Sequence, residues 1–262
     1  MEKISNVFKK GKALITYISA GDPDLEMTKK IVHTLDQAGV DIIELGIPFS
    51  DPLADGPVIQ AAGQRALENG VTLSLILETV KEMKPLIQAP IVFMGYYNNI
   101  ISYGQERFVQ DVKEAGASGL IVPDLPYDEE PEFYELINEY GLAGILLVTP
   151  NTPEERLKEI CRRSTGFLYC VSLLGVTGDR RGPQAGIKEY LQKVREYCPD
   201  LPLALGFGID GPEKVKEVLA DIDGIIIGSA LINIISSYNT EEEILANIST
   251  FIKGIKEGLK AL

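Results

Sequence analysis

The sequence predicts an α/β protein whose eight parallel strands, each followed by a helix, close into a (β/α)8 barrel of the TIM type. Three observations support this fold. Eight short apolar runs alternate with amphipathic segments, most runs are nearly continuous in apolar residues, and the glycine-rich turn of an open, doubly wound sheet is absent. The chain has 262 residues, a length at which such barrels commonly form one domain. We therefore expect one barrel domain over residues 1–262.

Each predicted strand is a short apolar run, as expected of parallel strands that are buried on both faces. The turn after the first run reads GDPD at residues 21–24, which lacks the G-x-G-x-x-G pattern of a dinucleotide-binding sheet. A closed barrel is therefore favoured over an open sheet. The predicted strands are 13–20, 41–48, 90–96, 119–126, 144–150, 167–173, 202–209 and 224–231.

The segments between the strands have apolar residues at helical spacing and a charged opposite face. The predicted helices include 25–37, 106–115, 130–140, 154–163 and 212–220, and an extra helix is expected before the first strand. Two long loops interrupt the regular spacing: residues 49–60 follow the second strand, and residues 174–184 follow the sixth. Both belong to the C-terminal face of the predicted barrel, where active sites of this fold lie.

Composition limits the partners and the compartment. The formal net charge of −13 opposes binding to nucleic acids and to anionic membranes, so neither is expected as a partner. The three cysteines form no C-x-x-C pair, and the N-terminal segment lacks the apolar run of a signal peptide. We expect reduced thiols in a cytoplasmic protein. A single histidine without a cysteine pair gives no basis for a transition-metal site.

The catalytic candidates are carboxylates. Glu44 lies inside an apolar strand on the same face as Ile42, where burial would raise its pKa toward the range of a general acid–base. A structural ion pair is an equally open interpretation of Glu44. Asp55 follows in the next loop, within reach of Glu44, although aspartate before glycine is also a common turn residue. Asp22 and Asp124, which also end strands, are expected as turn or helix-cap residues.

Glycine-bearing segments end the sixth, seventh and eighth βα units, at residues 175–178, 206–209 and 228–230. Glycine lets backbone amides approach an anion closely. Barrels often bind a phosphate with the loops after strands seven and eight and with the N-terminus of a short extra helix, here predicted over 230–236. The last two segments contain no Lys or Arg, so amide donors suit this acidic chain. The three segments together predict a phosphate site.

Together these residues resemble the tryptophan synthase α-subunit family, and the resemblance spans nearly the whole chain. It implies a retro-aldol cleavage of indole-3-glycerol phosphate to indole and glyceraldehyde 3-phosphate, without a cofactor. It also implies a β subunit as partner in an α2β2 heterotetramer, to which indole passes during tryptophan biosynthesis. The segments that carry the resemblance are ELGIPFSDPLADGP at 44–57, GVTG at 175–178, GFGI at 206–209 and GSA at 228–230, supported by YISAGDP at 17–23, GYYN at 95–98 and VPDLP at 122–126.

The resemblance also implies roles for single residues. Glu44 matches the catalytic acid–base position, and Asp55 matches the aspartate that contacts the indole N1–H. The other matching positions are Tyr169 and Thr177 near the substrate, Gly178, Gly208, Gly228 and Ser229 around the phosphate, and Tyr17, Ile59, Met94 and Ile121 around the indole ring. Tyr17 departs from the phenylalanine that is common in the family, so its hydroxyl would need a partner if buried. Segments 48–55, 98–104 and 178–182 are expected to face the β subunit.

Three alternatives stay open at this point. The chain could be a stand-alone lyase that releases indole, another phosphate-binding barrel such as an isomerase or decarboxylase, or a degenerate barrel that only activates a β subunit. The second class would want a strand-borne lysine or a metal-binding histidine, and neither stands at a strand end. Glu44 and Asp55 argue against the third. Tyr96, Tyr97 and Tyr103 fit a core, a substrate wall or an interface equally well.

Overall fold

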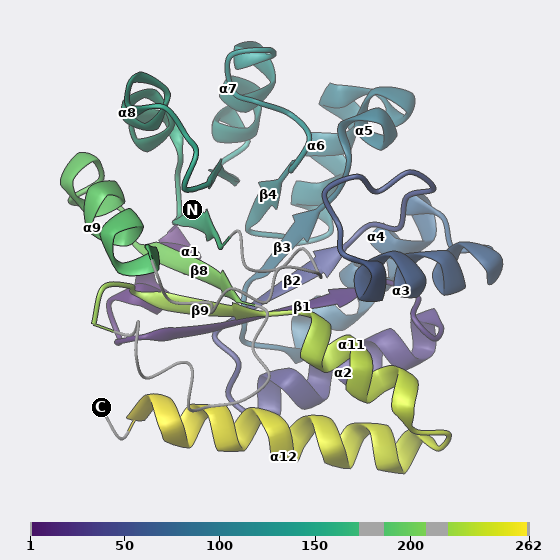
Figure 1. The fold of residues 1–262 in the computed structure, drawn as a ribbon. Helices are drawn as coiled ribbons and strands as arrows, with labels where there is room; N and C mark the ends of the chain where they lie inside the picture. Colours follow the sequence, from purple (N-terminus) through teal and green to yellow (C-terminus); the bar gives the residue numbers. More distant parts are fainter. Residues whose placement is uncertain (1, 173–185, 208–219, 261–262) are drawn as a thin grey trace.

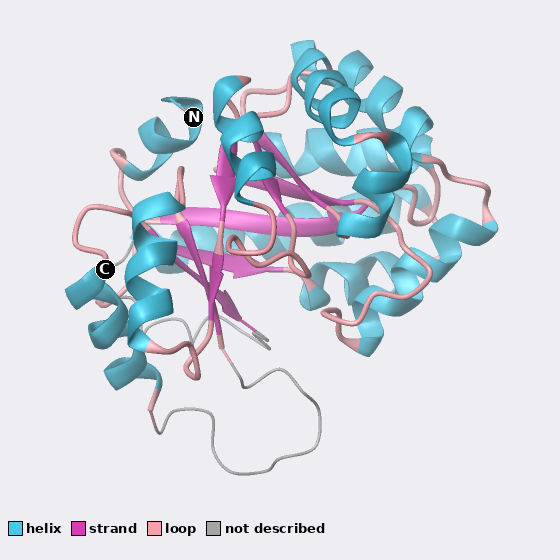
Figure 2. Ribbon diagram, turned by 90° about the horizontal axis from the view of Figure 1, so that it is seen from above, coloured by secondary structure: helices cyan, strands magenta, loops and turns pink. Residues whose placement is uncertain are grey.

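The computed structural model describes residues 2–172, 186–207 and 220–260 (Figure 1). Its strand segments form one parallel sheet in the order β5-β4-β3-β2-β1-β9-β8-β7-β6. The strands are β1 (Ala13–Ser19), β2 (Ile42–Gly46), β3 (Ile91–Met94), β4 (Gly119–Ile121), β5 (Ala143–Ile145), β6 (Leu147–Val148), β7 (Leu168–Val171), β8 (Leu203–Phe207) and β9 (Gly224–Ile227). Seen from above, the helices surround this sheet (Figure 2).

The two ends of the sheet order, β5 and β6, are the halves of one interrupted strand. Only Leu146 separates them, and its N–H donates to the Ser164 hydroxyl at 3.1 Å instead of continuing the strand ladder. Its carbonyl accepts the N–H of Tyr169 at 3.0 Å, on the β7 side. Together β5 and β6 stand where the sequence predicts a fifth strand at 144–150. The sheet therefore closes into a parallel barrel of eight strands, as predicted.

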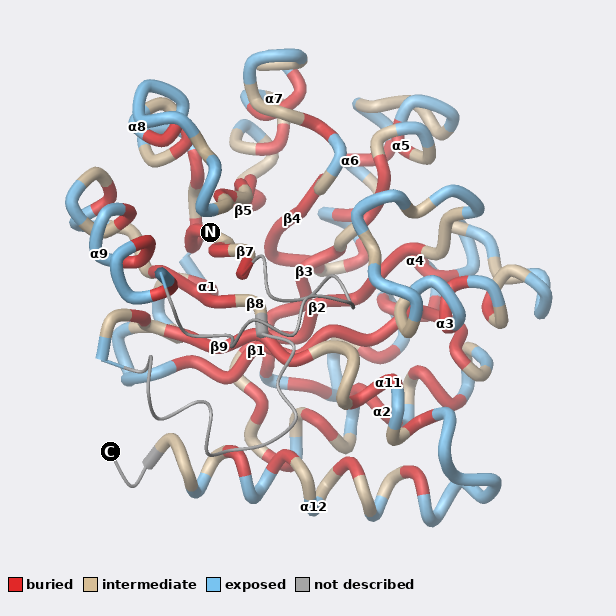
Figure 3. Tube along the Cα trace, in the orientation of Figure 1, coloured by how far each residue is buried: buried red, intermediate tan, exposed pale blue. Residues whose placement is uncertain are grey.

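The helices lie outside the barrel and turn their buried faces toward it (Figure 3). They are α1 (Glu2–Phe8), α2 (Leu25–Gln37), α3 (Pro57–Glu68), α4 (Leu73–Met83), α5 (Tyr97–Tyr103), α6 (Gln105–Glu114), α7 (Pro131–Glu139), α8 (Glu154–Arg163), α9 (Ile187–Tyr197), α11 (Ser229–Ser237) and α12 (Glu241–Lys260), with a 3-10 turn η1 (Lys84–Leu86). None of these described helices is long and apolar enough to cross a membrane.

The helix predictions agree with the structure where clear caps are present. The Asp24 carboxylate accepts the N–H of Met27 at 2.7 Å and starts α2 at the predicted residue. One prediction is wrong: the loop predicted over 49–60 ends at Gly56, because Pro57 occupies the first turn of α3, where proline is well tolerated. The predicted loop 174–184 lies outside the described residues, and so does the predicted helix 212–220 except for its last residue.

Apolar side chains form two layers, one between the strands and the helices and one inside the barrel. The N-terminal helix α1 closes the N-terminal end of the barrel interior. Ile4 is fully buried in the interior cluster, and the rings of Phe8 and Phe167 lie 5.7 Å apart. The opposite, C-terminal end carries the loops that hold the candidate catalytic residues.

Candidate active site

Glu44 points into the barrel. Its strand neighbour Ile42 belongs to the interior cluster, whereas Ile43 and Leu45 belong to the outer layer, so the strand alternates as the sequence predicts. The Glu44 side chain has no exposed surface, and neither carboxylate oxygen has a hydrogen-bond partner among the described residues. Within this part of the chain, the structural ion pair that the sequence left open is not formed.

The buried position of Glu44 sets its protonation. Removal from water disfavours the charged form and raises the pKa of Glu44 from its ordinary value of 4.5 to about 8. The group is therefore largely protonated at neutral pH and can give a proton to a bound molecule. A carboxyl pKa near the working pH is what general acid–base catalysis requires.

Asp55 is held at the mouth of the barrel by Tyr96, which ends the segment after β3. The Tyr96 hydroxyl accepts the N–H of Ala54 at 3.0 Å and donates to the Asp55 carboxylate. The Tyr96 ring stacks on Phe49 with centroids 5.1 Å apart. Partial burial raises the pKa of Asp55 to about 6, and the Tyr96 hydrogen bond opposes this rise. Asp55 is thus mostly ionised at neutral pH, whereas Glu44 is mostly neutral.

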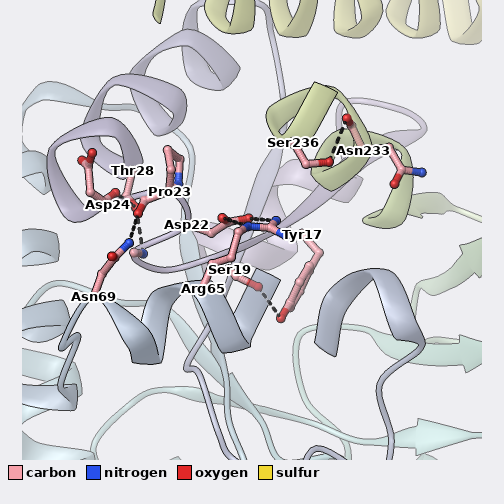
Figure 4. A network of polar contacts seen from close by, with 11 residues as sticks. Tyr17, Ser19, Asp22, Pro23, Asp24, Thr28, Arg65, Asn69, Asn233 and Ser236 are labelled. Atoms are coloured by element: carbon pink, nitrogen blue, oxygen red, sulfur yellow. Dashed lines mark hydrogen bonds and ion pairs between the residues drawn. The ribbon is translucent and has the colours of Figure 1, made fainter. Parts of the chain in front are cut away.

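Two phenols complete this cluster. Burial raises the pKa of Tyr17 and of Tyr169, and the carboxyl groups of Glu44 and Asp55, when ionised, raise both further. The Tyr17 Cα is the register partner of the Glu44 Cα across β1 and β2. The Tyr17 hydroxyl lies 3.4 Å from the Ser19 hydroxyl, the partner that its burial requires (Figure 4). The structure therefore brings two carboxyl groups and two phenols together inside one end of the barrel.

A glycine in β2 makes room for this arrangement. A Cβ added at Gly46 would lie 2.1 Å from the Tyr17 hydroxyl oxygen, so only glycine fits against this ring. In the same way, a Cβ at Gly206 in β8 would lie 2.8 Å from Cε1 of Tyr169. Both glycines therefore admit an aromatic ring into the barrel interior.

The predicted indole-wall residues lie in three different elements. Ile121, in β4, is fully buried in the interior cluster, and Met94, at the end of β3, is half-buried against the same cluster. Ile59 is half-buried in the first turn of α3, the helix that directly follows the Asp55 loop. Ile121 and Met94 thus share the barrel interior with Glu44, whereas Ile59 approaches from the rim.

Part of the predicted phosphate site is described. Gly228 precedes α11 and Ser229 is its first residue, directly after β9, so the helix N-terminus stands at the C-terminal end of the barrel. The first N–H groups of a helix have no partner within it and favour anions. A Cβ at Gly228 would lie 3.3 Å from Cβ of Tyr17, which places this turn beside the catalytic cluster. The predicted positions Thr177, Gly178 and Gly208 lie outside the described residues.

Two cavities distinguish the ends of the barrel. One of about 440 Å³ opens at the C-terminal end and is lined by Ala54, Val122, Leu147 and Val171, among others. A larger one of about 900 Å³ lies at the N-terminal end, between α1, α2 and α4. Of these two cavities, only the smaller one borders the Asp55 loop. We therefore place the candidate site at the C-terminal end of the barrel, although the larger cavity lies at the other end.

Sequence reasoning missed two pairings. It left Tyr96 without a role, and no local pattern could connect Tyr96 to Asp55 in a different loop. It also did not foresee the partner of Asp22, which lies in a turn as expected, with its N–H donating to the Ser19 carbonyl at 3.3 Å. The buried Asp22 carboxylate accepts two 2.8 Å hydrogen bonds from Arg65 of α3 (Figure 4). Asp124 lies in a turn, as expected, and accepts the N–H of Tyr97 at the start of α5, a helix from an earlier part of the chain.

Comparison with known proteins identifies the family. The family model for the tryptophan synthase alpha chain matches residues 5–260. The tryptophan synthase alpha chain of Petrotoga mobilis is 57% identical over 257 residues, which are 98% of this chain and 99% of the relative. That of Thermoanaerobacter sp. strain X514 is 47% identical and covers 95% of this chain and 94% of its own length.

Solved structures agree with the sequence relatives. The crystal structure of tryptophan synthase subunit alpha from Legionella pneumophila str. Paris has a TM-score of 0.92 at 36% identity and covers 100% of both chains. Tryptophan synthase from M. tuberculosis, in an open form with BRD0059 bound, has a TM-score of 0.88 at 30% identity and covers 98% of each chain. The chain belongs to the tryptophan synthase alpha chain family.

Proposed function

We propose that this chain cleaves indole-3-glycerol phosphate to indole and glyceraldehyde 3-phosphate, with Glu44 as the acid–base group and Asp55 as the contact to the indole N1–H. One observation carries the assignment of roles. Glu44 is a fully buried carboxyl with no partner among the described residues and a pKa of about 8, and the second carboxyl that acts on the same two phenols, Asp55, has a pKa of about 6. The two groups thus hold different protonation states at neutral pH, as an acid and an anionic stabiliser require.

The chemistry follows from those two states. Protonated Glu44 gives its proton to C3 of the indole ring, which leaves positive charge on the ring nitrogen. The Asp55 carboxylate stabilises that charge through the N1–H. The Glu44 carboxylate then takes the proton of the glycerol hydroxyl next to the ring. As the carbonyl forms, the C–C bond breaks and its electrons return to the ring, so Glu44 ends protonated and no cofactor is consumed.

The substrate phosphate would bind at the start of α11. Gly228 allows close backbone approach, Ser229 offers a hydroxyl, and the helix N-terminus offers amide donors. In this proposal Thr177, Gly178 and Gly208 complete the substrate contacts. Tyr17, Met94, Ile121 and Ile59 would enclose the indole ring, and Tyr169 would lie beside the substrate.

We further propose that the chain works with a β subunit in an α2β2 heterotetramer and passes indole to it in the cytoplasm. Two exposed apolar side chains on the predicted partner surface support this: Leu53 is 94% exposed and Ile101 is 54% exposed. They lie in segments 48–55 and 98–104, at the same end of the barrel as Asp55. Segment 178–182, the third expected contact, falls outside the described residues.

Turnover of indole-3-glycerol phosphate by the pure chain, with β subunit titrated in, tests both proposals. We expect slow release of indole by the chain alone and faster turnover with β present. Absence of cleavage under both conditions would refute the activity. Binding of β without any change in turnover would refute the activation while leaving the cleavage intact. Gel filtration with and without β reports complex formation independently and separates this enzyme from a stand-alone lyase.

A further inference from the structure

Two of the three cysteines meet at the surface where α8 and α9 pack side by side (Figure 1). Cys161 lies in the last turn of α8, and Cys198 directly follows α9. Both residues line one cavity at this surface, and each thiol shifts the pKa of the other. The third cysteine, Cys170 in β7, lies within electrostatic range of both.

The two thiols differ in access and in acidity. Cys161 is half-buried, whereas Cys198 is 2% exposed. Both line a surface cavity of about 330 Å³, together with Arg162 and Tyr197. The neighbouring Cys198 thiol lowers the pKa of Cys161, whereas the Cys161 thiol raises the pKa of Cys198. Cys161 is therefore the thiol that ionises first and that a small reagent in the cavity meets first, and the thiolate is the reactive form of cysteine.

We propose that Cys161 and Cys198 form a dithiol site that reacts with hydroperoxides and closes into an intramolecular disulfide. The Cys161 thiolate attacks one peroxide oxygen, so an S–O bond forms while the O–O bond breaks and the second oxygen leaves as water or alcohol once protonated. The Cys198 sulfur then attacks the Cys161 sulfenic acid. The S–S bond forms, the S–O bond breaks, and hydroxide leaves as water with the Cys198 proton. Two electrons pass from the thiols to one peroxide.

The bridge would join the ends of a segment that belongs to the candidate site. Residues 162–197 include β7 with Tyr169 and the sequence 175–178 that carries Thr177. Oxidation would thus tie α8 to the residue after α9 and restrict this segment in the unfolded chain. The oxidised protein should melt at a higher temperature than the reduced one.

The test uses the purified full-length chain, treated with hydrogen peroxide and then denatured for thiol titration, intact mass and peptide mapping. We expect free thiols to fall from three to one, the mass to drop by about 2 Da, and one disulfide-linked peptide pair to contain Cys161 and Cys198. Cys170→Ser is the matched control and should still lose two thiols. Cys198→Ser should stop at a sulfenic acid that dimedone traps on Cys161, and Cys161→Ser should not form the bridge.

Four results would overturn the proposal. These are three unreacted thiols after peroxide treatment, oxidation of Cys161 to sulfinic acid without a bridge, a bridge that includes Cys170, and a bridge between two chains. Peptide mapping of the wild-type protein distinguishes all four. The test therefore holds even where a serine variant fails to fold.

Discussion

Replacing Glu44 with glutamine tests the chemistry of the buried carboxyl and its energetic cost together. Glutamine matches the shape of a protonated glutamic acid but cannot ionise. The pKa of Glu44 rises from 4.5 to about 8 on burial, so between these values the folded chain holds a proton that the unfolded chain releases. Wild-type stability therefore falls as pH rises through this range and levels off above it. At about 1.4 kcal/mol per pH unit, the full loss is about 5 kcal/mol.

Glu44→Gln should abolish this loss. In urea unfolding at a series of pH values, the variant and the wild type should match near pH 4.5, and the variant should become more stable by up to about 5 kcal/mol near pH 8. The rate of indole-3-glycerol phosphate cleavage should drop by about 100- to 10,000-fold, which is the usual contribution of general acid–base catalysis. Glu155→Gln, on a side chain that is 88% exposed, should change neither property. Parallel pH profiles, or wild-type turnover by Glu44→Gln, would contradict the assigned role.

Three further predictions follow from contacts around the site. Tyr96→Phe removes a hydrogen bond that lowers the pKa of the catalytic aspartate, so the acid limb of the kcat/KM profile should move upward from about pH 6; an unmoved limb would contradict this. Gly46→Ala puts a Cβ 2.1 Å from the hydroxyl oxygen of the buried Tyr17 and should lower the free energy of unfolding by about 1–3 kcal/mol, measured in urea. Gly63→Ala, at a position in α3 with open space around it, should instead raise the free energy of unfolding by about 0.5–1 kcal/mol. Arg65→Ala leaves the buried carboxylate of Asp22 unpaired and should lower the unfolding free energy by about 2–3 kcal/mol, less than a fully buried pair loses because Arg65 is 38% exposed.

Local periodicity predicted the parts of the site that depend on one strand. The orientation of Glu44 follows from alternation in β2, and the strand count followed from eight separate apolar runs. The start of α3 was misjudged because proline and glycine at 56–57 were interpreted as loop residues. In the structure they are the cap and the first residue of the helix. The same residue types thus fit a loop and a helix start equally well in one sequence.

Contacts between distant segments were beyond that reasoning. Tyr96 meets Asp55 only because the ends of β2 and β3 are neighbours in the barrel, and the tyrosine hydroxyl has no sequence signature of its partner. The interruption at Leu146 is also a tertiary effect, since the Ser164 hydroxyl captures the Leu146 N–H. In both cases a side chain from another segment competes for a polar group, and one-dimensional patterns do not record such competition.

The helix at the base of the barrel has a consequence for the order of assembly. Ile4 lies against Gly119 and Gly166, and Phe8 lies against Gly224. During synthesis α1 leaves the ribosome before any of these partners, and its last contact waits for β9. Contacts between residues so far apart in sequence form slowly. Docking of α1 is therefore a late event, and until then the apolar side chains of Ile4 and Phe8 lack these partners.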